Sequence, residues 1–386
     1  MVVWVWVAWI FAIVWLLRTI PVWYGLLWPQ DLRDIAPAEG GDLPSVSLIV
    51  PARDEARAIE KALRTMLTLD YPRMEIIAIN DRSTDGTGAI MDRVAAEDAR
   101  LKVAHVETLP AGWLGKNHAA HIGVQAASGD FLLLTDGDIL FDPQILRRAM
   151  RLVDQRRLDH LVLLPDPLAE TFWEKVLINF FMVMLLTASQ AAFARCSWAK
   201  KAYLGVGAFN LLRRSAYVGI GGHEPLRMEV ADDVCLGKLI KQGGYRQDVF
   251  IATEYLKVKW QHGGLWGIVR GLEKNSFAAM NFSVGQVLFG CTMLGLALIV
   301  PPVLAIIGPT ELRVPMALMA IANLLMFVIT AWRNRTPLLT GVLHPIGAAL
   351  FILTILRSTA ITLRAGGIRW RDTFYPLEEL RKGKVR

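Results

Sequence analysis

One stretch, residues 131–138, restricts the fold of this chain more than any other. Residues 131–135 (FLLLT) form an apolar run that predicts a short buried strand. Asp136 and Asp138 follow at once, with one glycine between them. In an open α/β sheet, ligands bind beyond the carboxyl ends of the strands, and two hard oxygen ligands there suit Mg²⁺ or Mn²⁺ carrying a phosphate. A tight Asp-Gly turn explains the same residues without a ligand.

Short apolar strands alternate with helical stretches on both sides of this run. The predicted strands are residues 46–50, 75–79, 101–106, 131–135 and 161–164. The predicted helices are residues 55–69, 85–99, 116–127 and 143–155. This alternation predicts the α/β class, with a mostly parallel sheet covered by helices on both faces.

Apolar residues make up 54% of the chain and gather in runs typical of membrane spans. Residues 1–28 predict a retained N-terminal anchor, because no basic segment precedes the run and no small-residue cleavage site follows it. Pro301-Pro302 and His344-Pro345 are expected to bend or break two of the later runs. Three later runs are each about long enough to span: residues 287–307, 314–332 and 338–356.

The side of the membrane on which each segment lies is constrained by two further stretches. Residues 176–193 are long enough to span, but a single crossing there would put Asp138 and Asp233 on opposite sides. We therefore expect this run to lie in the interface or to pack in the domain. The tail, residues 364–386, holds seven Arg or Lys against three Asp or Glu, which favours the cytoplasmic side. One span before the domain and three after it would place the tail on the side of the membrane opposite the domain. Either one run is therefore re-entrant, or the tail does not follow the positive-inside rule.

The charge balance favours phosphates and lipid headgroups over nucleic acid as partners. The net charge is +7, but no lysine-rich block or nucleic-acid motif is present. Cys196, Cys235 and Cys291 are far apart and odd in number, which predicts reduced thiols and neither a zinc site nor a disulfide framework.

Acidic motifs end the first two predicted strands as well. PARDE, at the end of the first, contains Asp54 and Glu55, and NDRSTDGT, at the end of the second, contains Asp81 and Ser83. A carboxylate at a strand end can accept hydrogen bonds from a ribose or a base. The alternative is a helix cap by Ser83 or Asp85, and we favour that role for Asp85.

Three further segments carry candidate ligand-binding groups. Lys116 follows two glycines at the start of a predicted helix, where it could meet a phosphate; a loop with an exposed lysine is the alternative. The glycine-rich segments 205–210 and 219–223 suit either the close approach of a sugar or ordinary turns. Asp232 and Asp233 start a probable helix and form a candidate general base with a supporting neighbour, although Asp232 could be no more than an N-cap.

Taken together, these motifs resemble those of the inverting glycosyltransferases of family 2, whose nucleotide-sugar domain has the GT-A fold. The match runs from about residue 44 to residue 275, with PARDE, NDRSTDGT, the DGD after FLLLT, and ADDVCL in the family's order and approximate spacing. The PAGWLGK stretch, the segment 172–174 (FWE) and the C-terminal runs look most like the hopanoid-associated and carotenoid- or ceramide-type lipid glycosyltransferases.

The resemblance implies a role for each matching residue. Asp233 is the base, with Asp232 beside it in place of the family's usual Glu-Asp pair, and Asp138 binds the metal with help from Asp136. The processive branch carries Gln-x-x-Arg-Trp, whereas here Gln261 and Trp266 are five apart with no arginine before the tryptophan, which argues against polymer synthesis. The residues implied in donor binding are Pro51, Asp54, Glu55, Asp81, Ser83, Lys116, Asp136, Arg270 and Lys274.

These observations predict a membrane-anchored α/β enzyme with N-terminal and C-terminal transmembrane helices. It would move a sugar from a nucleotide-diphosphate donor, a UDP-sugar by preference, to a lipid hydroxyl with inversion and with Mg²⁺ or Mn²⁺. The alternatives are a processive polysaccharide synthase and a catalytically inactive nucleotide-sugar-binding membrane protein. We expect the cell (inner) membrane, with the catalytic domain cytoplasmic. The predicted parts are an anchor (1–28), a GT-A domain (44–283), transmembrane segments (285–363) and a basic tail (364–386).

Overall fold

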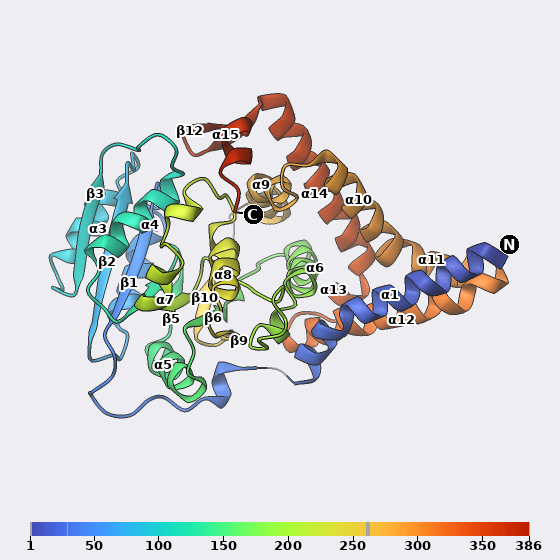
Figure 1. Cartoon of the computed structure of the whole chain (residues 1–386), viewed down its shortest axis with the longest axis horizontal. Helices are drawn as coiled ribbons and strands as arrows, with labels where there is room; N and C mark the ends of the chain where they lie inside the picture. The colour runs from blue at the N-terminus through green and yellow to red at the C-terminus, as the bar shows by residue number, and fades with distance from the viewer. Residues whose placement is uncertain (1, 29, 260–262, 386) are drawn as a thin grey trace. The chain divides into compact units, whose positions relative to one another are not determined.

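The computed structural model describes residues 2–28, 30–259 and 263–385, and it contains two compact units (Figure 1). Each unit is assembled from separate segments of the chain. The sheet unit comprises residues 30–168, 193–259 and 382–386, and the helical unit comprises residues 1–29, 169–192 and 260–381.

The sheet unit is built on seven strands in the order β3-β2-β1-β4-β8-β6-β9. Strand β8 runs antiparallel to both of its neighbours, and all other pairs are parallel, as the sequence predicts. The bounds are β1 Val46–Ala52, β2 Met74–Asp81, β3 Leu101–Val106, β4 Phe131–Leu134, β6 His160–Leu164, β8 Asn210–Arg213 and β9 Gln247–Ile251. A small second sheet pairs β5 Leu140–Phe141, β10 Leu256–Val258 and β7 Asp166–Pro167.

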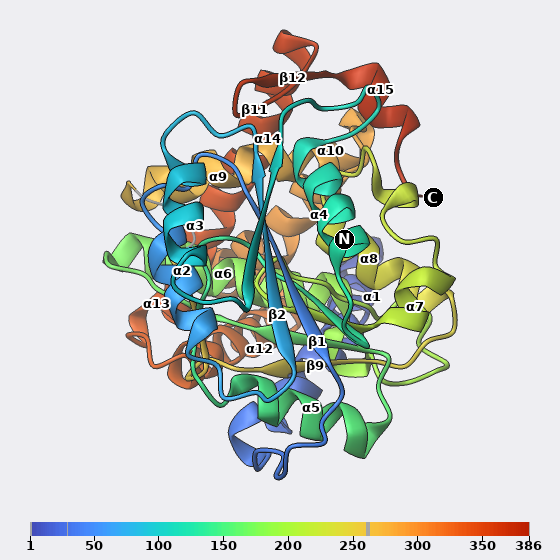
Figure 2. The same ribbon diagram turned by 90° about the vertical axis from the view of Figure 1, so that its left-hand side faces the viewer.

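Helices cover both faces of the large sheet (Figure 2). Along β1, Leu48 and Val50 pack into the core under one set of helices, while Ile49 between them packs into a second core on the other face. A strand of a parallel sheet is buried on both faces, which is why it is continuously apolar. The first face carries α2 Ile59–Leu67, α3 Thr87–Ala95 and α5 Ile145–Arg156, and the second carries α4 Gly115–Ala126, α7 Arg214–Gly219 and α8 Asp232–Gln242.

All five predicted strands and all four predicted helices form, with ends that shift by about four residues at most. Strands β8 and β9 are not anticipated by the sequence. Each is short and begins with polar residues or a single polar residue, and the place of each in the sheet depends on partners far away in the chain. The described cysteines are free, as expected.

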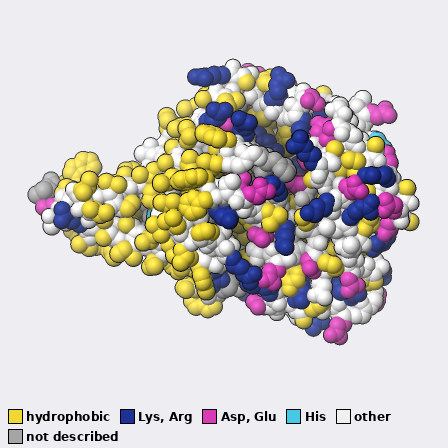
Figure 3. Space-filling model, turned by 180° about the vertical axis from the view of Figure 1, so that it is seen from behind, with side chains coloured by type: hydrophobic (Ala, Val, Ile, Leu, Met, Phe, Trp, Pro, Cys, Tyr) yellow, Lys and Arg dark blue, Asp and Glu magenta, His cyan; other side chains and the backbone are white. Residues whose placement is uncertain are grey.

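The helical unit contains the helices that are long and apolar enough to cross a membrane. Among the described residues there are five of these, and Figure 3 shows hydrophobic side chains gathered over this unit. They are Val3–Leu27, Phe172–Ser189, Val284–Ile307, Thr310–Arg333 and His344–Ala365. In the element numbering they correspond to α1 Val2–Leu27, α6 Phe172–Ser189, the run α10 Val284–Leu294, η4 Gly295–Ile299 and α11 Val300–Ile307, α12 Thr310–Arg333 and α14 His344–Ala365. The unit also holds α9 Gly264–Ala279, α13 Leu339–Val342, β11 Gly367–Trp370, β12 Thr373–Pro376 and α15 Leu377–Lys382.

Proline marks the irregular points of these helices, as expected. A π-helical turn, Gly295–Ile299, ends two residues before Pro301, because proline has no backbone N–H to donate in a regular α-helix. The short helix α13 ends before α14 begins, so the helical run is interrupted there. Pro345 lies in the first turn of α14, where its missing N–H has no effect.

The C-terminal tail, residues 382–385, belongs to the sheet unit and packs on the segment that precedes α8. The Lys384 ammonium lies 3.1 Å from the buried carboxylate of Glu229, and the Val385 N–H donates to the same carboxylate at 3.1 Å. Lys238, on α8, donates to the Val385 carbonyl at 3.1 Å. These contacts with the tail stabilise the segment that precedes Asp232 and Asp233.

Candidate active site

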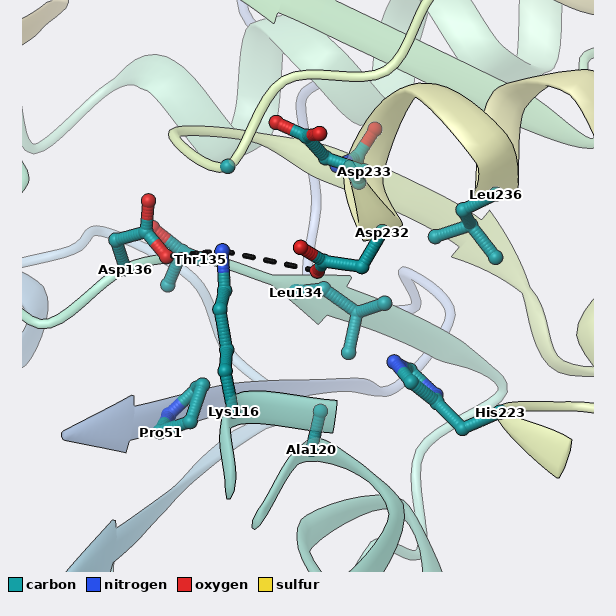
Figure 4. Close-up of a pocket in the computed structure, with 12 residues that line it drawn as sticks. Pro51, Lys116, Ala120, Leu134, Thr135, Asp136, His223, Asp232, Asp233 and Leu236 are labelled. Carbon is teal, nitrogen blue, oxygen red and sulfur yellow. Dashed lines mark ion pairs between the residues drawn. The ribbon is translucent and has the colours of Figure 1, made fainter. Parts of the chain in front are cut away.

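A pocket of about 330 Å³ lies at the carboxyl ends of β1 and β4, between the starts of α4 and α8 (Figure 4). It brings together five of the residues predicted for the site: Pro51, Lys116, Asp136, Asp232 and Asp233. The rest of its lining is Ala120, Leu134, Thr135, Gly207, Asn210, His223 and Leu236.

Lys116 is the cation at the centre of this pocket. Its ammonium lies 2.8 Å from Asp136 Oδ1 and 3.6 Å from Asp232 Oδ2, and three-quarters of the side chain is buried. Burial alone would lower the pKa of Lys116, but the carboxylates of Asp136, Asp232 and Asp233 raise that pKa above its usual value. The alternative of an exposed loop lysine is therefore wrong, and Lys116 stays charged at physiological pH.

Glycines allow the backbone to approach these acidic side chains closely. A Cβ on Gly115 would overlap the Asp81 carboxylate, and a Cβ on Gly207 would overlap that of Asp136. The Asp136 N–H also donates to the Gly207 carbonyl at 2.9 Å, and a Cβ on Gly205 would overlap the Asp233 carbonyl. The glycine-rich segment 205–210 is thus a spacer between the two acidic motifs.

Asp138 is partly buried beside other carboxylates. Burial, together with repulsion from Asp136 and Glu55, raises the pKa of Asp138 to about 7. Among the described residues, no group of three or more His, Cys, Asp or Glu is arranged to hold a metal ion. Two carboxylates nevertheless fit Mg²⁺ or Mn²⁺, because Mg²⁺ takes one or two carboxylates when substrate phosphates supply further ligands.

Asp232 and Asp233 occupy the first turn of α8. The helix begins at Asp232 itself, and Ala231 stands at the N-cap without a side-chain hydrogen bond, so the N-cap interpretation of Asp232 is wrong. The Asp232 carboxylate instead faces Lys116. Asp233 accepts the Val234 N–H at 2.8 Å; burial raises the pKa of Asp233, and the nearby Lys116 lowers it only in part. A carboxylate with a raised pKa is a stronger base.

The turns after β1 and β2 are held to each other by hydrogen bonds. The Asp54 N–H donates to Ser83 Oγ at 3.1 Å, and the Asp54 carboxylate accepts the Thr84 N–H at 2.8 Å. Asp54 and Arg82 both adopt positive φ, 52° and 55°, which is uncommon outside glycine. The buried Asp81 accepts two hydrogen bonds from Arg82, at 2.7 and 3.0 Å. The Glu55 N–H donates to the Thr87 hydroxyl at 2.8 Å, so both ends of the turn are fixed.

The remaining predicted residues belong to the helical unit. Arg270, on α9, is exposed, and the Lys274 ammonium lies 4.0 Å from the centre of the Trp370 ring. Their part in donor binding stays a prediction. Gln261 lies outside the described residues.

Sequence reasoning missed two residues that belong to this region. Asn117 donates to the carbonyls of Leu226 and Glu229 at 2.6 and 3.0 Å and so joins the start of α4 to the segment before α8. His223 lines the pocket. Each lies next to a motif in the sequence, since Asn117 follows Lys116 and His223 ends a glycine-rich segment. These positions in the sequence do not distinguish a site residue from a turn residue.

Comparison with known proteins agrees with the fold and the motif order. The sequence model of glycosyl transferase family 2 matches residues 47–220. The 4,4'-diaponeurosporenoate glycosyltransferase of Staphylococcus haemolyticus is 22% identical over 239 residues, 61% of this chain and 62% of that protein. The beta-monoglucosyldiacylglycerol synthase of a Synechocystis species is 32% identical over 161 residues, 38% of this chain and 31% of that protein. The chain thus spans less than two thirds of the length of these curated relatives.

Among solved structures, mannosyltransferase PcManGT from Pyrobaculum calidifontis, in complex with GDP-Man and Mn²⁺, aligns with a TM-score of 0.49 at 19% identity. That alignment covers 92% of this chain and 98% of the other. The family match stands on the sequence, and its range contains β1 to β4, β6 and β8 of the large sheet. Residues 47–220 therefore match glycosyltransferase family 2, and they form most of a mostly parallel α/β sheet of the kind expected for a GT-A fold.

Proposed function

We propose that this protein is an inverting glycosyltransferase that moves a sugar from a nucleotide-diphosphate donor, a UDP-sugar by preference, to a hydroxyl of a membrane lipid. The observation that carries the proposal is the convergence of Lys116 with Asp136, Asp232 and Asp233 at the strand ends of a family 2 domain. The long apolar helices support an acceptor that resides in the bilayer. One relative, named as a monoglucosyldiacylglycerol synthase, supports a lipid acceptor as well.

The donor would bind across the carboxyl ends of β1, β2 and β4. The turns containing Asp54, Glu55, Asp81 and Ser83 would hold the nucleoside, with Pro51 below it. Asp138 and Asp136 would hold Mg²⁺ or Mn²⁺, a role supported by the raised pKa of Asp138. A divalent cation bound there supplies charge neutralisation for the diphosphate leaving group.

Asp233 would act as the general base. Its carboxylate takes the proton from the acceptor hydroxyl while that oxygen bonds to the anomeric carbon. The bond from this carbon to the diphosphate breaks at the same time, and the nucleotide diphosphate leaves with the electron pair, so one displacement inverts the carbon. Asp232 would hold Lys116 in place at 3.6 Å, and Lys116 would meet the negative diphosphate.

Product analysis tests the proposal. The full chain in lipid vesicles is incubated with a panel of nucleotide sugars and Mn²⁺ or Mg²⁺, and the lipids are extracted for mass spectrometry and NMR. We expect a lipid that has gained one sugar with inverted anomeric configuration, and no such product from Asp233→Asn or after chelation. Retained configuration would contradict the mechanism. A ladder of sugars would indicate a processive synthase, and donor binding without product would indicate an inactive binding protein.

A further inference from the structure

His223 is a pocket residue that the mechanism above does not use. It lies between α7 and the short helix η3 Glu224–Leu226, its exposed fraction is 2%, and its ring points into the pocket (Figure 4). The hydroxyl of Tyr217, on α7, lies 2.5 Å from His223 Nδ1, and both side chains are buried. Nδ1 is therefore engaged inside the protein, and Nε2 is the nitrogen that a ligand in the pocket can reach.

The hydrogen bond to Tyr217 determines which ring nitrogen carries the proton. A neutral imidazole has one N–H and one acceptor nitrogen. If Nδ1 carried the hydrogen, the Tyr217 hydroxyl would accept it and its own hydrogen would need another partner. Within the described part of the chain, this hydroxyl forms hydrogen bonds with His223 alone: the backbone N–H of His223 donates to it, and Nδ1 is the one acceptor for its hydrogen. Because a buried unsatisfied donor is costly, the hydroxyl donates to Nδ1, and Nε2 carries the hydrogen.

The protonation state of His223 is fixed as well. Burial, together with the neighbouring positive groups His121 and Lys116, lowers the pKa of His223 to about 3. The ring is thus neutral throughout the physiological range, and its Nε2–H remains a donor there.

We propose that His223 Nε2–H donates a hydrogen bond to a hydroxyl of the transferred sugar, with Tyr217 as the positioning residue that fixes the tautomer, so that this pair selects the donor sugar. The inference rests on the proposed function and deepens it. Figure 4 shows Asp136 on one side of Lys116 and His223 on the other, so a sugar attached to a diphosphate at Asp136 would reach the imidazole. Leu134 and Leu236 line the same pocket, and an N–H left unpaired beside apolar side chains is costly.

Selectivity for the sugar is the first test. The full chain is assayed with its best nucleotide sugar and with the monodeoxy analogues of that sugar, and kcat/KM is compared. We expect one deoxy position at which the parent discriminates by about tenfold or more, since a site built to bind a hydroxyl rejects the analogue that lacks it. His223→Phe should reduce this ratio to near one, and His223→Gln, which keeps an N–H donor, should restore part of it. His105→Phe is the matched control, because His105 lies on β3 outside the pocket and bonds to Asn80 and Asp92.

The tautomer is the second test and does not depend on activity. ¹⁵N NMR of histidine-labelled protein, with the His223 signal assigned by its loss in His223→Phe, should show the hydrogen on Nε2. Tyr217→Phe should give a mixture of tautomers together with weaker sugar selectivity. A hydrogen on Nδ1, or a His223→Phe variant that slows all donors by the same factor, would overturn the inference while leaving the proposed function intact. Absence of sugar transfer by the parent protein would refute the proposed function, and this inference with it.

Discussion

The acidic residues at the carboxyl edge of the sheet form two groups with different partners. The outer acidic turns follow β1 and β2, and their carboxylates bond to nearby backbone N–H groups or to arginine: Asp54, Asp81 and Asp85. The central acidic cluster follows β4 and begins α8, around the single ammonium of Lys116: Asp136, Asp138, Asp232 and Asp233.

Asp85, in an outer turn, and Asp138 and Asp233, in the central cluster, have pKa shifts of opposite direction. Hydrogen bonds from Thr87 and Ala56 outweigh desolvation and lower the pKa of Asp85, whereas burial raises the pKa of Asp138 and Asp233. Carboxylates that the chain itself satisfies stabilise turns. Carboxylates crowded together and partly removed from water destabilise the empty fold, and such groups gather at functional sites because a ligand or a proton relieves them. Residues of one type therefore fall into two kinds: carboxylates whose hydrogen-bond partners the chain supplies, and carboxylates that a ligand or a proton would stabilise.

The largest effect is expected within the central acidic cluster. Asp233→Asn removes the proposed base and should lower glycolipid formation by about 10²–10⁴-fold, the typical contribution of a general base. Donor affinity should survive, because the base contacts the acceptor and not the diphosphate. Asp232→Asn should lose less. Donor binding by calorimetry and product formation by mass spectrometry measure both effects, and near-parental turnover by Asp233→Asn would remove it from the mechanism.

The next effect concerns the metal. Asp138→Asn should weaken divalent-dependent nucleotide-sugar binding by about tenfold or more, because a neutral amide is a poorer ligand for a hard cation. Asp142→Asn is a control from the other end of β5, since among the described residues its carboxylate accepts a local N–H, from Gln144 at 2.9 Å. Calorimetry with Mn²⁺ and UDP measures the affinity of each variant. Equal affinities for the two variants would exclude Asp138 from the metal site.

The raised pKa of Asp138 gives a pH dependence of the same binding. The carboxyl must lose its proton to bind a cation, and its pKa is about 7. Above pH 7 the group is ionised and affinity for Mn²⁺ should be constant. Below pH 7 the affinity should fall by about tenfold per pH unit. Titrations from pH 5.5 to 8 measure this, and a midpoint near 4 would show that the carboxyl is not perturbed.

The smallest effect is expected in the outer acidic turns. The helix-cap role expected for Asp85 is wrong, because the N-cap of α3 is Gly86, which makes no side-chain hydrogen bond. Asp85→Ala removes the acceptor for the Thr87 and Ala56 N–H groups, each at 3.0 Å, and should cost about 1 kcal/mol, as loss of a typical hydrogen bond does. For a unit of this size the Tm should fall by about 2–4 °C. Turnover at a temperature well below the Tm should stay close to the parent's. Asp42→Ala, which removes only an exposed ion pair with Arg73, should leave the Tm unchanged and serves as the control.

The order of strands and helices along the chain was enough to predict much of the fold and part of the candidate site. Asp136 and Asp138 follow their strand directly, and Lys116 starts its helix, so a strand-then-helix pattern places all three at one edge. What the sequence could not supply depends on distant pairing. The antiparallel β8 is inserted between β4 and β6 by contacts over long separations, and the N-cap expectation for Asp232 failed because Lys116, from another helix, faces its carboxylate. The orientation of His223 toward the pocket depends on Tyr217 and has no local signal.

The docking of the C-terminal tail on Glu229 limits how often the chain can cross a bilayer. Residues 259 and 382 both belong to the sheet unit, so the chain that joins them must return to the side from which it left. A return requires an even number of crossings, yet the described part of the joining chain, residues 263–381, contains three helices long and apolar enough to cross. We therefore expect one of these three to enter and leave the membrane on the same side, unless α9 also crosses. Cysteines introduced one at a time at exposed Gly40 and Lys382 should be labelled from the same side of the membrane; labelling from opposite sides would show that the tail does not dock.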